Sequence, residues 1–217
     1  MNTLSDLLEA LPALPLFPLP NTVLFPGALL PLHIFEPRYR AMVIDVLKTH
    51  RSMAVVMITN ERPMDAHGHP EIAQVAGLGT IVDHTELPGG RFNILLRGRV
   101  RVRLSELPFE QPYRRAAADV LVPPDEEITQ SELSALVSTA TAFAQFVRER
   151  DRGFEFRLPR DAKPALLADL CAHHLVLDAR ERQAILETLS PRARVRRVAE
   201  ALAMQRHTLL PGGRDLN

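Results

Sequence analysis

The sequence predicts an α+β protein in which an antiparallel β-barrel with one helix is followed by a bundle of α-helices. Short apolar segments separated by turn residues dominate as far as Val122, which is typical of strands joined by hairpins. After Pro123-Pro124 the apolar residues recur with the period of a helix. We therefore expect a barrel subdomain over residues 1–122, a helical subdomain over 123–210 and a disordered tail over 211–217.

The first informative segment, Ala10–Phe35, contains no Asp, Glu, Lys or Arg across its 26 residues. Its prolines exclude a transmembrane helix, because proline lacks the backbone N–H and clashes with the preceding turn. The N-terminus carries Asp6 and Glu9 where a secretory signal is basic, so we expect a cytoplasmic protein that does not enter membranes. The apolar pieces between the prolines predict extended segments at Leu14–Leu19, Val23–Phe25 and Leu29–Phe35.

A single helix is expected within the barrel region. Glu36 takes the N-cap position, Pro37 suits the first helical position, and apolar residues then recur at helical spacing to Thr49. Strands are predicted after this helix, with a longer exposed loop at Asn60–Pro70, and they cover Met53–Thr59, Val75–Leu87, Arg91–Leu96, Val100–Leu107 and Ala116–Val122. This spacing favours a closed or nearly closed antiparallel barrel over alternating βαβ units.

The second subdomain is expected to contain four helices. The first carries an apolar face from Leu133 to Val147, and the second starts near Pro164. A third opens at Asp178, with Glu181 at the spacing of a capping box. Ser190-Pro191 supplies the N-cap and first position of the last helix.

Composition and motifs exclude several classes of function. The 26 Lys and Arg equal the 26 Asp and Glu, so no overall charge attracts nucleic acid or anionic lipid. Neither a phosphate-binding loop nor a dinucleotide fingerprint is present. The pairs His67/His69 and His173/His174 lack further ligands at zinc spacing, and Cys171 lies on an apolar helix face where a cysteine is usually buried and unreactive. We expect no catalytic residue, no metal and no cofactor.

One run of residues is electrostatic in character: Arg97, Arg99, Arg101 and Arg103 alternate with small or apolar residues. On a strand this alternation places all four arginines on one face. The face is either a cationic surface for phosphate or acidic peptide, or a solvated outer face that pairs with acids such as Glu106 or Asp119. The zero net charge favours the second interpretation.

Two runs near the N-terminus resemble a known protein family. They read LPLFPLPNTVLFPG over residues 14–27 and LPLHIFEPRYR over residues 30–40, and they closely resemble the opening of the N-terminal, substrate-binding domain of Lon proteases. The similarity continues through the hairpin Glu86–Gly98, the strand start Pro112-Tyr113 and the helical Arg182–Glu187. It covers the chain from about Leu14 to Met204.

The resemblance implies a PUA-like pseudo-barrel followed by a helical bundle, in agreement with the pattern of apolar residues. It also implies that the chain recognises unfolded or damaged polypeptides, or a protein partner. Because 217 residues leave no room for the ATPase and Ser–Lys protease modules of Lon, we expect recognition without degradation. The candidate partner-binding residues belong to the matched N-terminal runs and either form the binding surface or support it: Phe25, Pro31, His33, Phe35, Glu36, Arg38 and Tyr39.

An extended peptide that adds to a sheet edge is the mode of binding that such a surface permits. Two alternatives remain beside protein recognition. PUA-like barrels also occur in RNA-associated proteins, so the arginines from Arg97 to Arg103 offer a surface for RNA. A hydrolase built around Cys171 is the third hypothesis. Neither nucleic acid nor a membrane is the partner that we expect.

Overall fold

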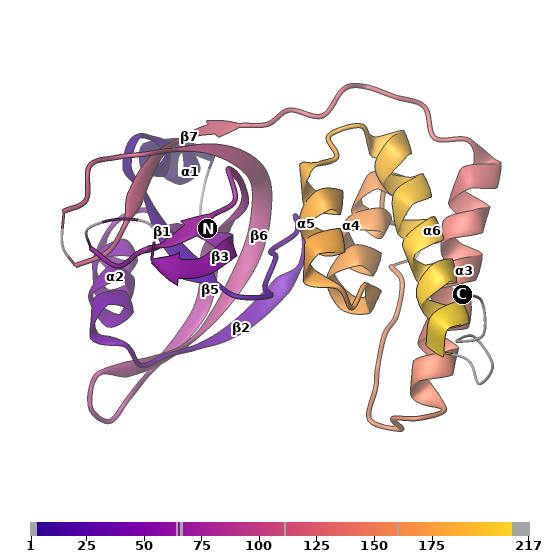
Figure 1. The fold of residues 1–217 in the computed structure, drawn as a ribbon, viewed down its shortest axis with the longest axis horizontal. Coiled ribbons are helices and arrows are strands. Elements are labelled where there is room, and N and C mark those ends of the chain that lie inside the picture. The colour runs from indigo at the N-terminus through magenta and orange to yellow at the C-terminus, as the bar shows by residue number, and fades with distance from the viewer. Residues whose placement is uncertain (1–3, 64, 66, 111, 160, 210–217) are drawn as a thin grey trace. The chain divides into compact units, whose positions relative to one another are not determined.

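The computed structural model describes residues 4–63, 65, 67–110, 112–159 and 161–209 (Figure 1). Residue contacts divide the chain into two compact units, unit 1 over Met1–Leu121 and unit 2 over Val122–Asn217. The α+β fold predicted from the sequence is confirmed. The tail expected at 211–217 lies outside the described residues. Within the described ranges, no helix combines the length and apolar character needed to cross a membrane.

Unit 1 is a barrel built on seven strands (Figure 1). Helix α1 (Leu4–Ala10) and a 3₁₀ turn (Leu11–Ala13) precede the first strand, and α2 (Pro37–Lys48) follows the second. The strands are β1 (Leu14–Leu19), β2 (Leu29–Ile34), β3 (Ser52–Pro63), β4 (Pro70–Ile72), β5 (Val75–Leu87), β6 (Arg91–Glu106) and β7 (Arg115–Val120).

The ring of strands closes by a pairing that the sequence did not predict. The order β1-β7-β6-β5-β3 is antiparallel throughout, but β1 then pairs in parallel with β3, with Leu16 opposite Ala54. The predicted antiparallel barrel is confirmed, with this one parallel pairing as the exception. Among the described residues, strand β2 pairs only with β6, and β4 pairs only with β3.

The segment Val23–Phe25, expected to be extended, is not a strand but a buried connection that crosses the neighbouring strands β5 and β6. It lies against Gly77 and Gly98, because a Cβ at either position would overlap the carbonyl oxygen of Leu24 or Phe25. The strand pair also shifts register between Leu78 and Gly79. Glycine inside a strand often marks such a close approach of another backbone segment.

Two other boundaries differ from the prediction. Arg91–Leu96 and Val100–Leu107 were expected as separate strands, whereas β6 continues from Arg91 to Glu106 through a bulge at Arg99, which has no partner on β5. The expected loop Asn60–Pro70 is shorter, because β3 runs on to Pro63 and β4 starts at Pro70. Local turn residues mark where pairing can stop, but the long-range partner decides where it does stop.

Unit 2 consists of the four predicted helices, α3 (Gln130–Arg148), α4 (Pro164–Leu175), α5 (Ala179–Glu187) and α6 (Pro191–Leu209). Thr129 and Glu132 form a complete capping box at the start of α3. At the start of α5, the Asp178 carboxylate accepts the Glu181 N–H at 2.7 Å. The Glu181 side chain, predicted to complete a second capping box, instead accepts hydrogen bonds from Arg197 of α6.

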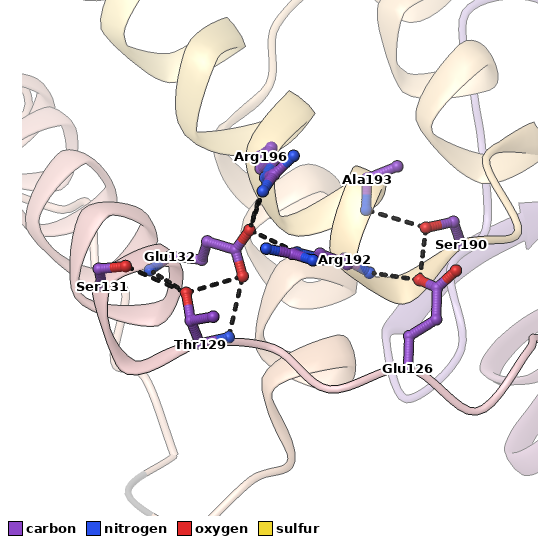
Figure 2. Close-up of polar contacts among 8 residues, drawn as sticks. All are labelled: Glu126, Thr129, Ser131, Glu132, Ser190, Arg192, Ala193 and Arg196. Carbon is purple, nitrogen blue, oxygen red and sulfur yellow. Dashed lines mark hydrogen bonds and ion pairs between the residues drawn. The ribbon is translucent and has the colours of Figure 1, made fainter.

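Polar contacts between the start of α3 and the first turns of α6 tie the helices of unit 2 together (Figure 2). The Glu132 carboxylate accepts hydrogen bonds from Arg192 Nε at 2.7 Å and Arg196 Nε at 2.6 Å. Glu126 accepts from the Ser190 hydroxyl at 2.6 Å. The hydrogen bond from Arg192 is the largest of the interactions that lower the pKa of Glu132 to about 2.

We expect this network to make unit 2 sensitive to acid. Because the folded pKa of Glu132 lies below the ordinary value of 4.5, its stabilising contribution is complete above that value and is lost as the pH falls towards about 2. Glu132→Gln should therefore lower the urea midpoint at neutral pH, and the difference from the parent protein should shrink on acidification. Glu155→Gln, which removes an exposed glutamate of the same unit, is the control and should change little. A deficit that is the same at neutral and acid pH would contradict this account.

Candidate functional site

A cavity of about 620 Å³ in unit 1 is lined in part by residues of the two N-terminal runs that resemble the Lon family. It is bordered by β1, the start of α2, β3, β4 and the two connections that precede β4 and β7. We call it the motif pocket, and it is lined by Leu16, Pro18, Leu19, Pro20, Glu36, Pro37, Arg38, Tyr39, Ile58, His67, His69, Pro70, Phe109, Pro112, Tyr113 and Arg114. Most of these side chains are apolar or aromatic, as in sites that take up an apolar group.

The first turn of α2 supplies the charged part of the motif pocket. Glu36 occupies the predicted N-cap position, but its side chain makes no cap hydrogen bond. Its Oε2 instead accepts Arg38 Nε at 3.0 Å and Arg38 Nη2 at 2.9 Å. Among the described residues, Glu36 Oε1 and Arg38 Nη1 make no further hydrogen bond. The half-exposed pair thus presents one spare acceptor beside one spare donor.

Tyr39 and Tyr113 fix the position of α2 against the barrel. The Tyr39 ring is buried and meets the Phe17 ring edge-on at 4.5 Å. The Tyr113 hydroxyl donates to Asp45 Oδ2 at 2.9 Å, so it joins the segment before β7 to α2. Burial, followed by this hydrogen bond, raises the pKa of Tyr113 to about 12, and the phenol remains a donor at neutral pH.

Arg114 stabilises the wall of the motif pocket that contains Pro70 and the segment before β7. Its guanidinium donates to both carboxylate oxygens of Glu106, at 2.9 and 2.8 Å, and to the Pro70 carbonyl oxygen at 2.9 Å. These contacts hold the end of β6, the start of β4 and the segment before β7 together. A bidentate arginine–carboxylate pair fixes geometry better than a single contact, so this wall is held in place before any ligand arrives.

The third wall is an aromatic cluster of His67, His69 and Phe109. The Phe109 ring centroid lies 4.9 Å from that of His67 and 4.4 Å from that of His69. Asp65 organises the turn by accepting the backbone N–H groups of His67 and His69 and by contacting His69 Nδ1 at 2.8 Å. The hydrogen bond from the His69 N–H is the main reason why the pKa of Asp65 falls to about 2.

Comparison with known protein families shows which family the chain is related to. Residues 13–204 match the model of the ATP-dependent protease La (LON) substrate-binding domain. The chain belongs to the Lon substrate-binding domain family. The match covers both units, and the matched domain is a non-catalytic part of the protease.

Curated relatives and solved structures agree with this Lon family assignment. The chain is 30% identical over 203 residues to a Lon protease of Roseiflexus castenholzii, with 92% of this chain and 25% of the relative covered. It is 28% identical over 204 residues to Lon protease 2 of Myxococcus xanthus, with 90% and 24% covered. The chain thus spans about a quarter of the length of these relatives.

The fold matches solved Lon N-terminal domains. A Lon N-terminal domain protein from Xanthomonas campestris aligns with a TM-score of 0.61 at 23% identity, covering 92% of this chain and 99% of the other. The N-terminal domain of Mycobacterium avium complex Lon protease aligns with the same score at 14% identity, covering 88% and 98%. At these identities the likeness concerns the fold.

The Lon-like residues proposed from the sequence fall into three structural groups. Glu36, Arg38 and Tyr39 line the motif pocket. Pro31, His33 and Phe35 lie at or just after β2, where the exposed His33 and Phe35 rings stack at 6.0 Å and His33 Nδ1 lies 2.7 Å from Asn93 Oδ1. Phe25 is completely buried, so of its two proposed roles it cannot form the binding surface, and only a supporting role in the core remains.

Sequence reasoning missed the half of the motif pocket that lies beyond β3. His67 and His69 were considered only as possible zinc ligands, and Phe109 and Arg114 were not considered. These residues reach the pocket through pairings between distant strands, which local patterns do not encode. Tyr113 was the one available signal, because Pro112-Tyr113 is part of the Lon resemblance.

The four arginines do not form one exposed face. Arg97, Arg99 and Arg103 are exposed, whereas Arg101 is only 7% exposed and its guanidinium carbon lies 6.0 Å from the centre of the Phe25 ring. Arg99 is the extra residue of the bulge, and Arg103 lies opposite Asp119 of β7. The prediction that all four share a face was wrong, and the RNA alternative loses its continuous surface.

Burial decides the chemistry of Cys171 and of the two histidines that follow it in α4. Cys171 is completely buried, and burial raises the pKa of its thiol to about 12, so the nucleophilic thiolate is absent at neutral pH. The rings of His173 and His174 meet edge-on at 4.8 Å, and burial lowers the pKa of His174. Within the described part of the chain, no group of three or more His, Cys, Asp or Glu side chains could hold a metal ion.

Proposed function

We propose that unit 1 recognises unfolded polypeptide by taking an apolar side chain of the segment into the motif pocket. The observation that carries the proposal is the position of the Glu36–Arg38 pair at an apolar, aromatic cavity of about 620 Å³. A peptide bond has one donor and one acceptor, which complement the spare Glu36 Oε1 and Arg38 Nη1. A polypeptide main chain can therefore bond at the pair while its side chain enters the pocket.

The charge of the pair matches this ligand. Glu36 and Arg38 neutralise each other, so the entrance favours neither acidic nor basic segments. Extended chains of many sequences share the amide group, whereas folded proteins have already bonded most of theirs. Such a site distinguishes unfolded from folded protein by the accessibility of the main chain. The names of the Lon relatives are in keeping with a role in supplying polypeptide to a protease.

The exposed apolar residues around β2 extend the proposed surface. Phe35, which is 60% exposed, directly precedes Glu36, and Leu29 is 41% exposed at the other end of β2. Exposed aromatic and aliphatic side chains next to a polar anchor are typical of recognition surfaces. We assign Phe35 to a secondary contact and Phe109 to the pocket wall.

Phe109→Ala should weaken binding of a fluorescently labelled, permanently unfolded reporter polypeptide about tenfold, as expected for losing most of one aromatic contact. Phe35→Ala should weaken it less. Fluorescence anisotropy measures both affinities, and circular dichroism checks that each variant is folded. Phe154→Ala, which truncates a phenylalanine of unit 2, is the matched control and should leave the affinity unchanged. The proposal fails if the parent protein does not bind saturably, or if folded Phe109→Ala binds as tightly as the parent.

A further inference from the structure

Unit 2 carries a groove of about 860 Å³ that the Lon-like N-terminal runs do not touch. Its walls are Leu177, the start of α5 and one side of α6. Three large apolar side chains at its border are exposed: Leu177 by 59%, Met204 by 73% and Leu209 by 46%. The lining of α6 extends from Ala193 to Leu209, which is about 24 Å at 1.5 Å per residue. That length accommodates a helix of about four turns.

Helix α6 has a second face besides the one that joins the unit. Val195, Val198 and Leu202 are completely buried in unit 2. The groove side carries residues spaced three and four apart, namely Ala193, Arg197, Glu200, Met204 and Thr208, which places them along one stripe of the helix. The small Ala193 and the 73% exposed Met204 on this stripe allow close contact with another helix.

The stripe on one copy of α6 is complementary to the same stripe on a second copy that runs antiparallel to it. If two copies of α6 run antiparallel about a two-fold axis at the level of Val198 and Ala199, Met204 of each copy lies opposite Ala193 of the other. The same register sets Glu200 opposite Arg197, twice. Large meets small and acid meets base, as an isologous interface requires.

The charged groups that this register joins have bonding capacity left. Glu200 makes no hydrogen bond or ion pair with any described residue, although its charge helps to raise the pKa of Arg197 on its own helix. Arg197 donates Nε and Nη2 to Glu181, at 2.7 and 3.1 Å, and within the described chain its Nη1 bonds nothing. One more carboxylate can approach Arg197 without breaking the contact with Glu181.

We propose that this groove binds a second copy of the chain, with α6 packed antiparallel against α6 of that copy. A single pair of helices is a small interface compared with those of stable dimers, so the dimer dissociates on dilution. The proposal is independent of the polypeptide-binding role of unit 1.

Sedimentation of the full chain over a range of concentrations tests the association. The parent protein should pass from monomer to dimer, and Met204→Glu should raise the dissociation constant at least tenfold by placing a carboxylate opposite Ala193. Val137→Glu, a matched change at a 37% exposed apolar residue of α3, should leave the dimer intact. A parent protein that stays monomeric, or a dimer that Met204→Glu does not weaken, overturns the proposal.

Cysteine cross-linking tests the antiparallel register. Cys171 is completely buried, so an introduced surface cysteine is the reactive thiol of the folded protein. A mixture of Ala193→Cys and Met204→Cys chains should form a disulfide-linked dimer under mild oxidation, whereas either variant alone should form little. Efficient cross-linking of either variant with itself, or none in the mixture, excludes this register.

Discussion

Replacing Arg194 with methionine should lower the free energy of unfolding of unit 2 by about 3–5 kcal/mol, the usual cost of removing one partner of a buried ion pair. The side chains of Arg194 and Asp169 are only 2% and 5% exposed, and Arg194 Nε lies 2.9 Å from Asp169 Oδ1. Arg194 Nη1 also donates to the carbonyl oxygens of Thr188 at 2.8 Å and Leu189 at 3.1 Å. The substitution leaves a buried carboxylate and removes the donor that ties α4 to the α5–α6 connection.

Unfolding of the two units in urea can be followed by different spectroscopic signals. It has no Trp, and both tyrosines, Tyr39 and Tyr113, belong to unit 1. Tyrosine fluorescence therefore reports unit 1, whereas helical circular dichroism reports mainly unit 2. Arg194→Met should shift the circular dichroism transition and leave the fluorescence transition in place.

Arg196→Met is the matched control, because it removes an arginine of the same helix whose side chain is 54% exposed. Its partner Glu132 keeps the hydrogen bond from Arg192, and exposed ion pairs contribute about 0–1 kcal/mol. In the double variant Asp169→Leu/Arg194→Met, no charge remains buried, so most of the lost stability should return. If Arg194→Met costs no more than Arg196→Met, the buried pair does not have the role assigned to it.

The burial of Arg194 could have been predicted from the sequence. Arg194 lies two residues from Arg192 and from Arg196, and therefore about 200° around the helix from each. It is spaced four residues from Val198, a core position. Helical geometry alone thus separates Arg194 from its neighbours, and only the identity of Asp169 as its partner required the structure.

Elements governed by neighbouring residues were predicted well. The start of α2 at Pro37 and of α6 at Pro191 agree with the prediction, because proline at the first helical position is a local signal. The parallel pairing of β1 with β3 was missed, since it joins segments nearly 40 residues apart and no local pattern specifies it. The prediction that Arg101 is exposed was wrong for a similar reason, because Phe25, which lies far from it in the sequence, packs near its guanidinium group.

The candidate site was predicted in part for the same reason. Glu36, Arg38 and Tyr39 were found because they are consecutive with a recognisable run of residues. Their pocket is completed by Phe109 and the histidines near Asp65, which the barrel brings in from later in the chain. The family residues serve folding and the site together, since Tyr39 packs on Phe17 while it borders the pocket.

Gly98→Ala should destabilise unit 1 by at least about 3 kcal/mol, at the upper end of the usual cost of overpacking. A Cβ at Gly98 would overlap the carbonyl oxygen of Phe25 and lie 2.8 Å from its carbonyl carbon. These are backbone atoms, held by the hydrogen bonds Gly27 N–H to Gly98 O and Gly98 N–H to Ala28 O, both 2.9 Å. The crossing segment cannot move aside without breaking them. Gly77→Ala should behave alike, because its Cβ would overlap the Leu24 carbonyl oxygen.

Gly89→Ala separates this steric effect from the general effect of replacing glycine. Gly89 has a φ of +80° and nothing within 4 Å of an added Cβ, so its substitution costs only the left-handed conformation, about 1–2 kcal/mol. Tyrosine fluorescence during urea unfolding measures all three variants. We expect Gly98→Ala and Gly77→Ala to lose clearly more stability than Gly89→Ala, and to lose polypeptide binding as well, because the segment they displace continues into β2 and Glu36. Equal losses at the three glycines would mean that the crossing segment is not held where the structure places it.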